Sequence, residues 1–198
     1  MPAGFTEKEQ ERIKEELFRT GIRLIKELGV QRTTVDKLTK NSGIAKGSFY
    51  LFYASKEEYL YALMEYTNGK TREMLERKLA GRARMTTKEF FELFREYLAS
   101  DYDLMNRMTM DDFLWLKKHM EGYQLFNPAL QIEMVKQWLL LMADARTDVD
   151  CGTVMNLMKA IYAMREHRDA LVEDSLENSI EIILRTLEAY ITGEDLGR

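Results

Sequence analysis

The residues with the clearest chemical character lie between positions 46 and 56, where lysines and hydroxyl-bearing side chains follow one another closely. Lys46 and Ser48 stand near the start of this segment, Tyr50 follows, and Lys56 closes it. A lysine ammonium donates to phosphate oxygens and to acceptors on base edges, and a hydroxyl both donates and accepts. These residue types are compatible with contact to a nucleic acid, but taken without a surrounding motif a core tyrosine and a solvated lysine are the favoured interpretation.

The charge of the chain is distributed unevenly. The whole chain carries a net charge of -4. Between Arg32 and Lys56, five basic side chains stand against one acidic side chain, so the remaining residues together carry about -8. Affinity for a polyanion depends on the charge at the contact face, so a locally basic segment on an acidic body is compatible with DNA binding. A chance fluctuation is the alternative, and charge alone would favour it.

Other reactive residues are sparse. His119 and His167 are the only histidines, and Cys151 is the only cysteine. The sequence has no paired-histidine or paired-cysteine motif and no glycine-rich phosphate loop. Cys151 stands at a predicted helix start, where a thiolate could be stabilised, but an inert thiol is the favoured interpretation. We therefore expect no enzymatic activity, no catalytic residue, no metal ion and no cofactor.

The composition predicts a soluble globular protein. Hydrophobic residues make up 45% of the chain and charged residues 31%. The longest strongly apolar run, Trp138–Ala143, is far shorter than the ~20 residues that cross a bilayer. No apolar signal segment is evident at the N-terminus, and a single cysteine allows no internal disulfide, so a cytoplasmic location is expected.

The pattern of apolar residues predicts an all-α protein. Only two prolines interrupt the chain, and threonine or serine caps with a glutamate three residues later recur. Asn127-Pro128 is typical of a helix start, and the apolar residues 138–142 are expected to be buried on every side. The expected helices are 7–28, 33–42, 46–52, a long helix from 55, one after Thr86, one from about 110 to 122, one after 127, and two at about 151–165 and 175–191.

Two of these helices have the layout of a helix-turn-helix. The elements are 33–42, a turn at 43–45 and a second helix at 46–52. Gly43 allows the sharp turn, and Leu38 and Phe49 supply apolar contacts between the helices. Small or polar residues at the start of the second helix would let it enter a major groove. The layout alone is only moderately specific, since other helical hairpins share it.

The segment from Thr33 to Glu58 is more specific, because its order of residues, TTVDKL followed by SGIAKGSFYLFYASKEE, resembles the TetR family of tetracycline-repressor-like regulators. The resemblance covers about residues 12–64. It implies an N-terminal helix-turn-helix DNA-binding domain, residues 1–55, and a C-terminal helical domain, residues 56–198, that binds an effector and dimerises. It thus implies a homodimeric repressor of transcription with double-stranded operator DNA as its partner.

The resemblance also implies roles for single residues. Thr33 resembles the cap of the second helix, and Thr34 a backbone or base contact at its start. The third helix supplies Lys46, Gly47 and Ser48 at base-edge and phosphate positions. Tyr50 and Lys56 resemble the phosphate-binding tyrosine and lysine of the family. Phe52 departs from the family pattern, because a phenyl ring cannot donate a hydrogen bond to a phosphate.

The C-terminal region is rich in methionine and aromatic residues, which suit an adaptable apolar pocket. An apolar or aromatic small-molecule effector contacting Trp115, Tyr123 and Trp138 is one interpretation. Ordinary core packing is the favoured alternative for any single residue. Broad apolar stripes on the last two helices suggest a second packing partner, consistent with a dimer, and a thick-cored monomer is the alternative. The stripes are Val154, Leu157, Ile161 and Met164, and then Leu176, Ile180, Ile183, Leu187 and Ile191, widened by Ile182 and Leu184.

Two other functions stay open from the sequence. One is a regulator controlled by a protein partner instead of a small molecule, for which a filled C-terminal domain without a cavity would argue. The other is a helical enzyme or carrier with an accidental helix-turn-helix match, against which the lack of a catalytic constellation argues.

Overall fold

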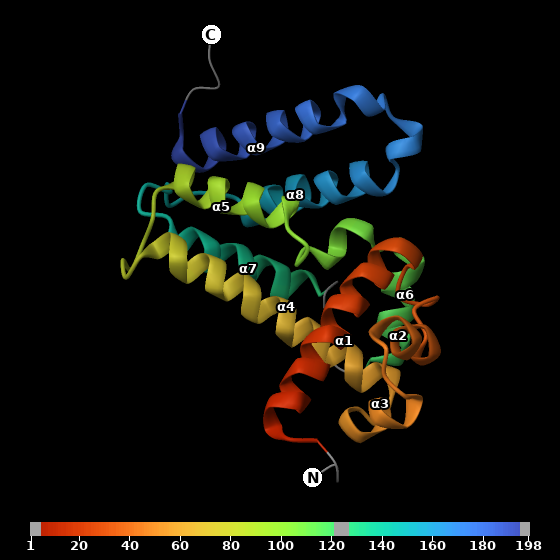
Figure 1. Ribbon diagram of the computed structural model, residues 1–198. Coiled ribbons are helices and arrows are strands. Elements are labelled where there is room, and N and C mark those ends of the chain that lie inside the picture. The colour runs from red at the N-terminus through yellow and green to blue at the C-terminus, as the bar shows by residue number, and fades with distance from the viewer. Residues whose placement is uncertain (1–4, 121–126, 195–198) are drawn as a thin grey trace. The chain divides into compact units, whose positions relative to one another are not determined.

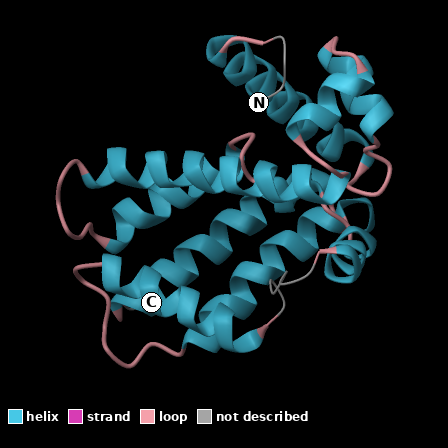
Figure 2. Ribbon diagram, turned by 90° about the horizontal axis from the view of Figure 1, so that it is seen from below, coloured by secondary structure: helices cyan, strands magenta, loops and turns pink. Residues whose placement is uncertain are grey.

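The computed structural model describes residues 5–120 and 127–194 and confirms the all-α fold class. Figure 2 shows helices joined by loops, and the only β-type contact in the described residues is an isolated bridge between Met85 and Met142. The α-helices are α1 (Glu7–Leu28), α2 (Val35–Ser42), α3 (Lys46–Phe52), α4 (Lys56–Leu79), α5 (Thr87–Ala99), α6 (Met110–His119), α7 (Pro128–Leu141), α8 (Cys151–Glu166) and α9 (Leu176–Thr192).

Most helix starts lie where the capping patterns predicted them. Thr6 and Thr86 each form a capping box with the glutamate three residues later, because the threonine hydroxyl accepts from the amide of that glutamate and the carboxylate accepts from the amide of the threonine. Asn127 caps α7 by accepting a hydrogen bond from the amide of Ala129, with Pro128 in the first turn. These polar groups satisfy amides that a helix start leaves without partners inside the helix.

One cap prediction is wrong. The N-cap of α2 is Thr34, whose hydroxyl accepts from the amide of Lys37. Thr33 is instead buried in the turn before the helix, where its hydroxyl donates to the carbonyl oxygen of Gly29 at 2.8 Å. Two threonines in succession offer two possible caps, and the buried one is committed to the turn.

The chain divides into two compact units. The first contains residues 1–71 and 101–123, and the second contains residues 72–100 and 124–198. This division differs from a single boundary near residue 55, because α6 belongs to the first unit. The assignment of DNA binding to residues 1–55 and of effector binding to residues 56–198 stays a prediction.

The first unit is built around buried aromatic rings. Tyr59 of α4 lies within 5.3–5.7 Å of the ring centroids of Phe49 and Tyr53, and its hydroxyl donates to the carbonyl oxygen of Leu17 at 2.7 Å. The approach of Tyr59 to α1 requires glycine at position 21, because a Cβ there would overlap the tyrosine hydroxyl. Burial raises the pKa of Tyr59 far above its ordinary value, so this hydroxyl stays a hydrogen-bond donor.

The second unit packs α5, α7, α8 and α9 with the end of α4. Figure 1 shows α9 in blue above α5 and α8, and both of these helices contact α9. The core of this unit consists of aliphatic, aromatic and methionine side chains, and Trp138 is half-buried at its edge, with its ring 6.1 Å from that of Phe90. The buried apolar area of this core is the main source of its stability.

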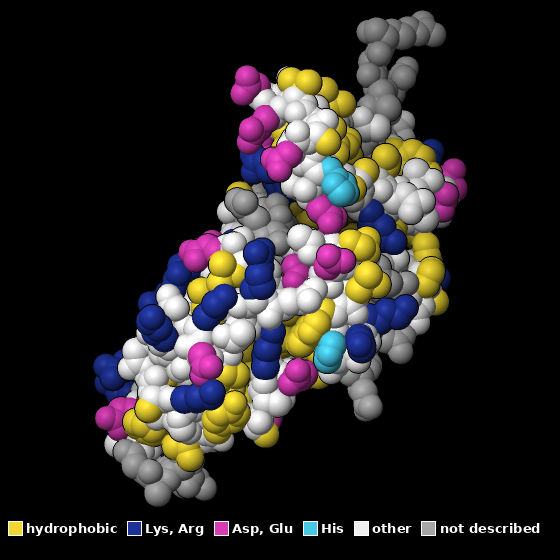
Figure 3. All heavy atoms as spheres, turned by 90° about the vertical axis from the view of Figure 1, so that its right-hand side faces the viewer, with side chains coloured by type: hydrophobic (Ala, Val, Ile, Leu, Met, Phe, Trp, Pro, Cys, Tyr) yellow, Lys and Arg dark blue, Asp and Glu magenta, His cyan; other side chains and the backbone are white. Residues whose placement is uncertain are grey.

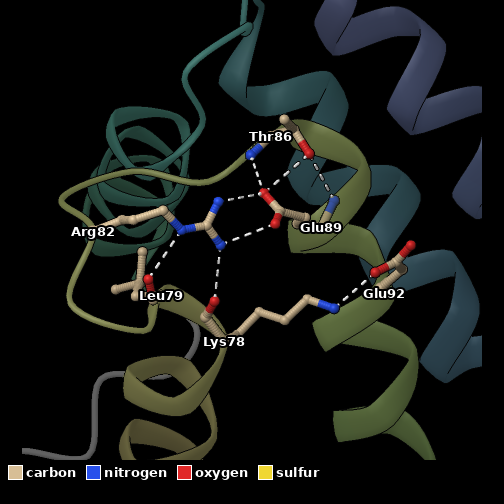
Figure 4. A network of polar contacts seen from close by, with 6 residues as sticks. All are labelled: Lys78, Leu79, Arg82, Thr86, Glu89 and Glu92. Carbon is tan, nitrogen blue, oxygen red and sulfur yellow. Dashed lines mark hydrogen bonds and ion pairs between the residues drawn. The ribbon is translucent and has the colours of Figure 1, made fainter.

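Ion pairs fasten the end of α4 to α5 in the second unit. Figure 4 shows Arg82 in the loop after α4, with its guanidinium donating to both carboxylate oxygens of Glu89, and Lys78 reaching Glu92 at 2.7 Å. The Arg82 guanidinium lowers the pKa of the Glu89 carboxyl to about 2. Arg82 also donates to the carbonyl oxygens of Lys78 and Leu79, so one side chain caps α4 and joins it to α5.

The prediction that residues 138–142 are buried on every side is wrong. Met142 is buried, but Leu140 is 57% exposed. The helix α7 ends at Leu141, so this run spans only its last turn and covers the core with one face. Continuous apolar sequence therefore does not imply burial when a helix end lies at the surface.

Candidate nucleic-acid interface

The turn between α2 and α3 depends on a glycine. Gly43 has φ +67° and ψ +25°, the left-handed conformation that closes α2. The amide of Ile44 then donates to the carbonyl oxygen of Thr39 at 3.1 Å, which completes the helix end. This turn sets the direction in which α3 leaves α2, as a helix-turn-helix requires.

Helix α3 buries one face and exposes the other. Phe49 is fully buried against Tyr53 and Tyr59, with ring centroids 5.6 and 5.7 Å away. On the other side, Lys46 and Tyr50 are exposed, as are Gly47 and Leu51, and Ser48 is half-exposed. No atom would lie within 4 Å of a Cβ at Gly47, so the surface beside it is open. The predicted contact residues of α3 thus share an accessible helix surface.

Lys46 pairs with an acidic residue of the other helix in the motif. Its ammonium lies 2.7 Å from a carboxylate oxygen of Asp36, in the first turn of α2. Hydrogen bonding to Asp36 raises the pKa of Lys46 above its ordinary value. Both side chains remain largely exposed, at 56% for Lys46 and 71% for Asp36. The spacing of Asp36 and Lys46 along the sequence does not indicate that the two side chains meet.

Thr34 and Tyr50 have different local roles. Thr34 is exposed, and its hydroxyl oxygen is engaged as the cap of α2. Tyr50 is 49% exposed, and the edge of its ring meets Phe49 at a centroid distance of 5.4 Å. Phe52, where the family pattern is broken, is half-buried and stacks on Phe5 at 6.2 Å. Of these three, Thr34 and Tyr50 keep polar atoms at the surface of the motif.

Lys56 is held by groups of the protein itself. Its ammonium donates to the carbonyl oxygens of Val30 at 2.6 Å and Gln31 at 3.2 Å. It also lies 4.4 Å from the centroid of the Trp115 ring, within the range of a cation–π interaction. Burial lowers the pKa of Lys56 below its ordinary value. A phosphate contact by Lys56, which the family resemblance implies, stays a prediction.

A carboxylate of α6 complements Lys56 at the same turn. One oxygen of Asp112 accepts from the amide of Gln31 at 3.2 Å, and the other accepts from the amide and hydroxyl of Thr109. Asp112 is buried, and a Cβ at Gly29 would lie 2.8 Å from it. Asp112 is a site residue that was not predicted, and the signal for it in the sequence is the Thr109-x-x-Asp112 capping pattern.

The three residues predicted to contact an effector belong to different parts of the chain. Trp115 belongs to the first unit, where its ring stacks on His119 at 4.3 Å and faces Lys56. Trp138 belongs to the second unit. Tyr123 lies outside the described residues. Their grouping as an effector site stays a prediction.

The charges on the first unit are mixed. On the face that Figure 3 shows, Lys and Arg side chains are interspersed with Asp and Glu side chains. No cluster of three or more histidine, cysteine or acidic residues that could hold a metal ion occurs in the part of the chain that the structure describes. Among residues 5–120 and 127–194, no helix has both the length and the apolar character needed to cross a membrane.

Sequence comparison matches the motif to a known family. Residues 14–63 match the family described as bacterial regulatory proteins, tetR family. An uncharacterized HTH-type transcriptional regulator of Bacillus subtilis, YerO, is 41% identical over 56 residues, which are 28% of this chain and 19% of that protein. The fatty acid metabolism regulator protein of the same organism is 26% identical over 91 residues, 45% of this chain and 47% of that protein. The matches thus span about a fifth to a half of these relatives.

Structural similarity extends over nearly the whole chain. A gamma-butyrolactone receptor superposes with a TM-score of 0.57 at 18% identity, covering 93% of this chain and 98% of that chain. The fatty acid degradation regulator FadR of Bacillus halodurans gives 0.55 at 15% identity, covering 88% and 97%. A TetR-family regulator of Haemophilus influenzae gives 0.50 at 20% identity, covering 89% and 96%. These likenesses show a shared fold.

The residues that match the family contain the helix-turn-helix of the structure. Residues 14–63 contain α2, the turn at Gly43 and α3, whose geometry is that of a helix-turn-helix. The remaining helices follow the layout of TetR-family structures. Residues 14–63 of this chain thus match the tetR family of bacterial regulatory proteins, and the chain shares the fold of a TetR-family regulator.

Proposed function

We propose that this protein is a ligand-responsive regulator that represses transcription by binding operator DNA and leaves the operator when a small, mostly apolar molecule binds. The observation that carries the DNA-binding half is the accessible surface of α3, where Lys46, Gly47 and Tyr50 are exposed while Phe49 anchors the helix. A helix with this division can enter a major groove without disturbing the core that holds it.

In the proposed complex, each contact residue has a role that follows from its chemistry. Lys46 and Ser48 read base edges, because an ammonium donates to guanine acceptors and a hydroxyl donates or accepts. Gly47 allows close approach of the helix to DNA, since it has no side chain. Thr34 and Tyr50 contact the phosphate backbone, to which hydroxyl groups commonly donate. Lys56, whose ammonium donates to the carbonyl oxygens of Val30 and Gln31, acts on DNA binding indirectly, by holding the turn before α2.

The proposed active form is a homodimer. One helix-turn-helix per chain reads one half-site, and a two-fold dimer reads a pseudo-palindrome with half-sites about 34–36 Å apart. The helix α9 offers an apolar residue for such an interface, because Ile182 is 57% exposed while Ile180 and Leu184 beside it are buried in the core. An exposed isoleucine on an otherwise amphipathic helix is consistent with a second packing partner.

The proposed effector is small and mostly apolar. The core of the second unit contains Phe90 and Met155, with Trp138 packed beside it, and these side chains adapt to apolar molecules. Proteins of the same fold include a gamma-butyrolactone receptor and a regulator of fatty acid degradation. A highly charged ligand would lose hydration in such surroundings with little compensation. The regulator would act where operator DNA lies, in the bacterial cytoplasm.

The contact assignments can be tested by substitution at α3. A duplex enriched by the wild-type protein from a random library serves as the probe. We expect Ser48→Ala to change the base preference at one or two positions of each half-site, and Tyr50→Phe to weaken binding to all sequences alike. Tyr61→Phe, which removes the hydroxyl of an exposed tyrosine on α4 instead of α3, is the matched control. Unchanged preference and affinity for both variants would refute the roles assigned to α3.

A further inference from the structure

The ion pair between Asp36 and Lys46 places an acidic group on the surface that is proposed to meet DNA. The two side chains come from the first turns of the two helices of the motif and meet at 2.7 Å. The role of Asp36 inferred below rests on the proposed DNA-binding function, because its carboxylate affects binding only when DNA approaches this surface.

The pair is not needed to hold the fold. Exposed ion pairs contribute roughly 0–1 kcal/mol to stability, and these side chains are 56% and 71% exposed. The buried Leu38 and Phe49 already fix α2 and α3 within the unit. Asp36 also stands in the first turn of α2, where an acidic residue interacts favourably with the helix dipole. The interaction with the helix dipole is by itself an ordinary reason for an aspartate at position 36. A control variant must therefore remove an aspartate from the first turn of another helix.

The pair has a larger effect on the electrostatic part of the affinity for DNA than on the stability of the fold. A lysine that neutralises a phosphate releases counterions, and this term supplies affinity without regard to sequence. A carboxylate at 2.7 Å already neutralises Lys46, and it repels phosphate oxygens. A contact between Lys46 and a phosphate therefore adds little binding free energy while Lys46 is paired with Asp36.

Base edges can satisfy both members of the pair. Guanine presents N7 and O6 acceptors to a lysine in the major groove, and cytosine presents an N4 amino donor to an aspartate. We propose that Asp36 is a specificity-determining residue, which weakens binding to DNA in general and, paired with Lys46, favours half-sites with a G·C base pair facing α3. The chemical class recognised is the pair of purine acceptors N7 and O6 beside an N4 amino donor, a combination that only a G·C base pair presents in the major groove.

The test compares Asp36→Asn with Asp111→Asn. Asp111 is also exposed, also belongs to the first unit and also occupies the first turn of a helix, α6, so both variants lose one negative charge at equivalent helix positions. Affinity is measured against salt concentration for two probes, a duplex enriched by the wild-type protein and a random-sequence duplex of equal length. Circular dichroism confirms that each variant is folded.

We expect Asp36→Asn to bind the random duplex roughly 3- to 10-fold more tightly at low salt, with a log–log salt slope steeper by about 0.9 for each protomer. The ratio of affinities for the enriched and random duplexes should fall at least 5-fold, in the range of one lost base contact. Adding Lys46→Met to Asp36→Asn should return the slope to the wild-type value. Asp111→Asn should change neither slope nor ratio.

Two results would overturn the inference in distinguishable ways. If the wild-type protein enriches a duplex but Asp36→Asn and Asp111→Asn behave alike, Asp36 has no special role while the proposed function stands. If the wild-type protein enriches no duplex at all, the proposed function fails and the role of Asp36 fails with it.

Discussion

The ammonium of Lys56 lies 4.4 Å from the centroid of the Trp115 ring and donates to the carbonyl oxygen of Val30 at 2.6 Å. The buried carboxylate of Asp112 accepts from the amide of Gln31 in the same turn. A cation thus binds the carbonyl groups of the turn between α1 and α2, and an anion binds an amide. Together they hold the turn that precedes α2, and α2 in turn positions α3.

Replacement of Lys56 should therefore lower the stability of the fold and leave the salt dependence of DNA binding unchanged. We expect Lys56→Ala to lower the free energy of unfolding by about 1–3 kcal/mol, because two carbonyl groups lose a charged donor. The salt slope of DNA binding should stay unchanged, since the ammonium is engaged within the protein. Urea unfolding and salt titration measure the two effects, with Lys8→Ala as the control. A slope lower by about one unit would instead support the phosphate contact implied by the family resemblance.

Gly47 should show opposite effects on stability and on binding. No atom lies within 4 Å of a Cβ at this position, so Gly47→Ala should leave the free energy of unfolding unchanged or raise it by up to ~1 kcal/mol. The added methyl group should weaken DNA binding at least 10-fold, because it enters the space where the helix meets the groove. Gly69→Ala is the matched control, since its surroundings in α4 are equally open. Equal DNA affinity for both variants would contradict the placement of Gly47 at the interface.

The ion pair between α5 and α9 predicts a dependence of stability on pH. Arg95 donates to both carboxylate oxygens of Glu181, at 2.8 and 3.0 Å, and these bonds lower the pKa of Glu181 from 4.5 to about 2. A carboxyl whose pKa is lower in the folded state stabilises that state above its unfolded pKa and loses this contribution as pH falls through the folded value.

We therefore expect Glu181→Gln to lower the free energy of unfolding at pH 7 by about 1–2 kcal/mol, allowing for solvent screening of a pair that is about one-third exposed. The difference between the wild-type and variant proteins should shrink between pH 4.5 and pH 2. Denaturant unfolding across this range measures it. Glu133→Gln removes a more exposed carboxylate of α7 and should show a smaller effect. A constant difference from pH 7 to pH 2 would show that the charge of Glu181 is not responsible.

Effector binding should change tryptophan emission and DNA affinity together. A hydrophobic ligand library is titrated against the wild-type protein and the single-tryptophan variants Trp115→Phe and Trp138→Phe. We expect hits to change the emission of Trp138, which lies beside the apolar core of the second unit. Because coupling between two sites is reciprocal, a hit that weakens DNA affinity by some factor must itself bind more weakly by that factor when DNA is present. Ligand affinity that is independent of DNA would exclude this regulation.

The local features of the fold were predictable from the sequence, because they depend on neighbours along the chain. The bounds of α1, the turn at Gly43 and the start of α7 follow from capping residues and apolar periodicity. The choice between Thr33 and Thr34 as the cap of α2 was not predictable in this way. It depends on the contact of Thr33 with Gly29, which forms only when the turn folds.

The candidate site was less predictable, because its contacts join distant parts of the chain. The residue types and positions of Lys46, Ser48 and Tyr50 indicated an exposed face on α3, and the structure places them on an accessible surface. The partner of Lys46 on α2 and the partners of Lys56 before α2 and on α6 had no signal in the spacing of the sequence. A lysine with a nearby acceptor in the fold cannot be told from an exposed lysine by sequence alone.

Selection of duplexes from a random library by the wild-type protein, followed by sequencing, tests the central claim most directly. The account predicts enrichment of a pseudo-palindrome whose two half-sites lie about one helical turn apart, bound by two copies of the chain. Failure to enrich any sequence, or enrichment of a single unpaired site bound at full affinity by one copy, would contradict it.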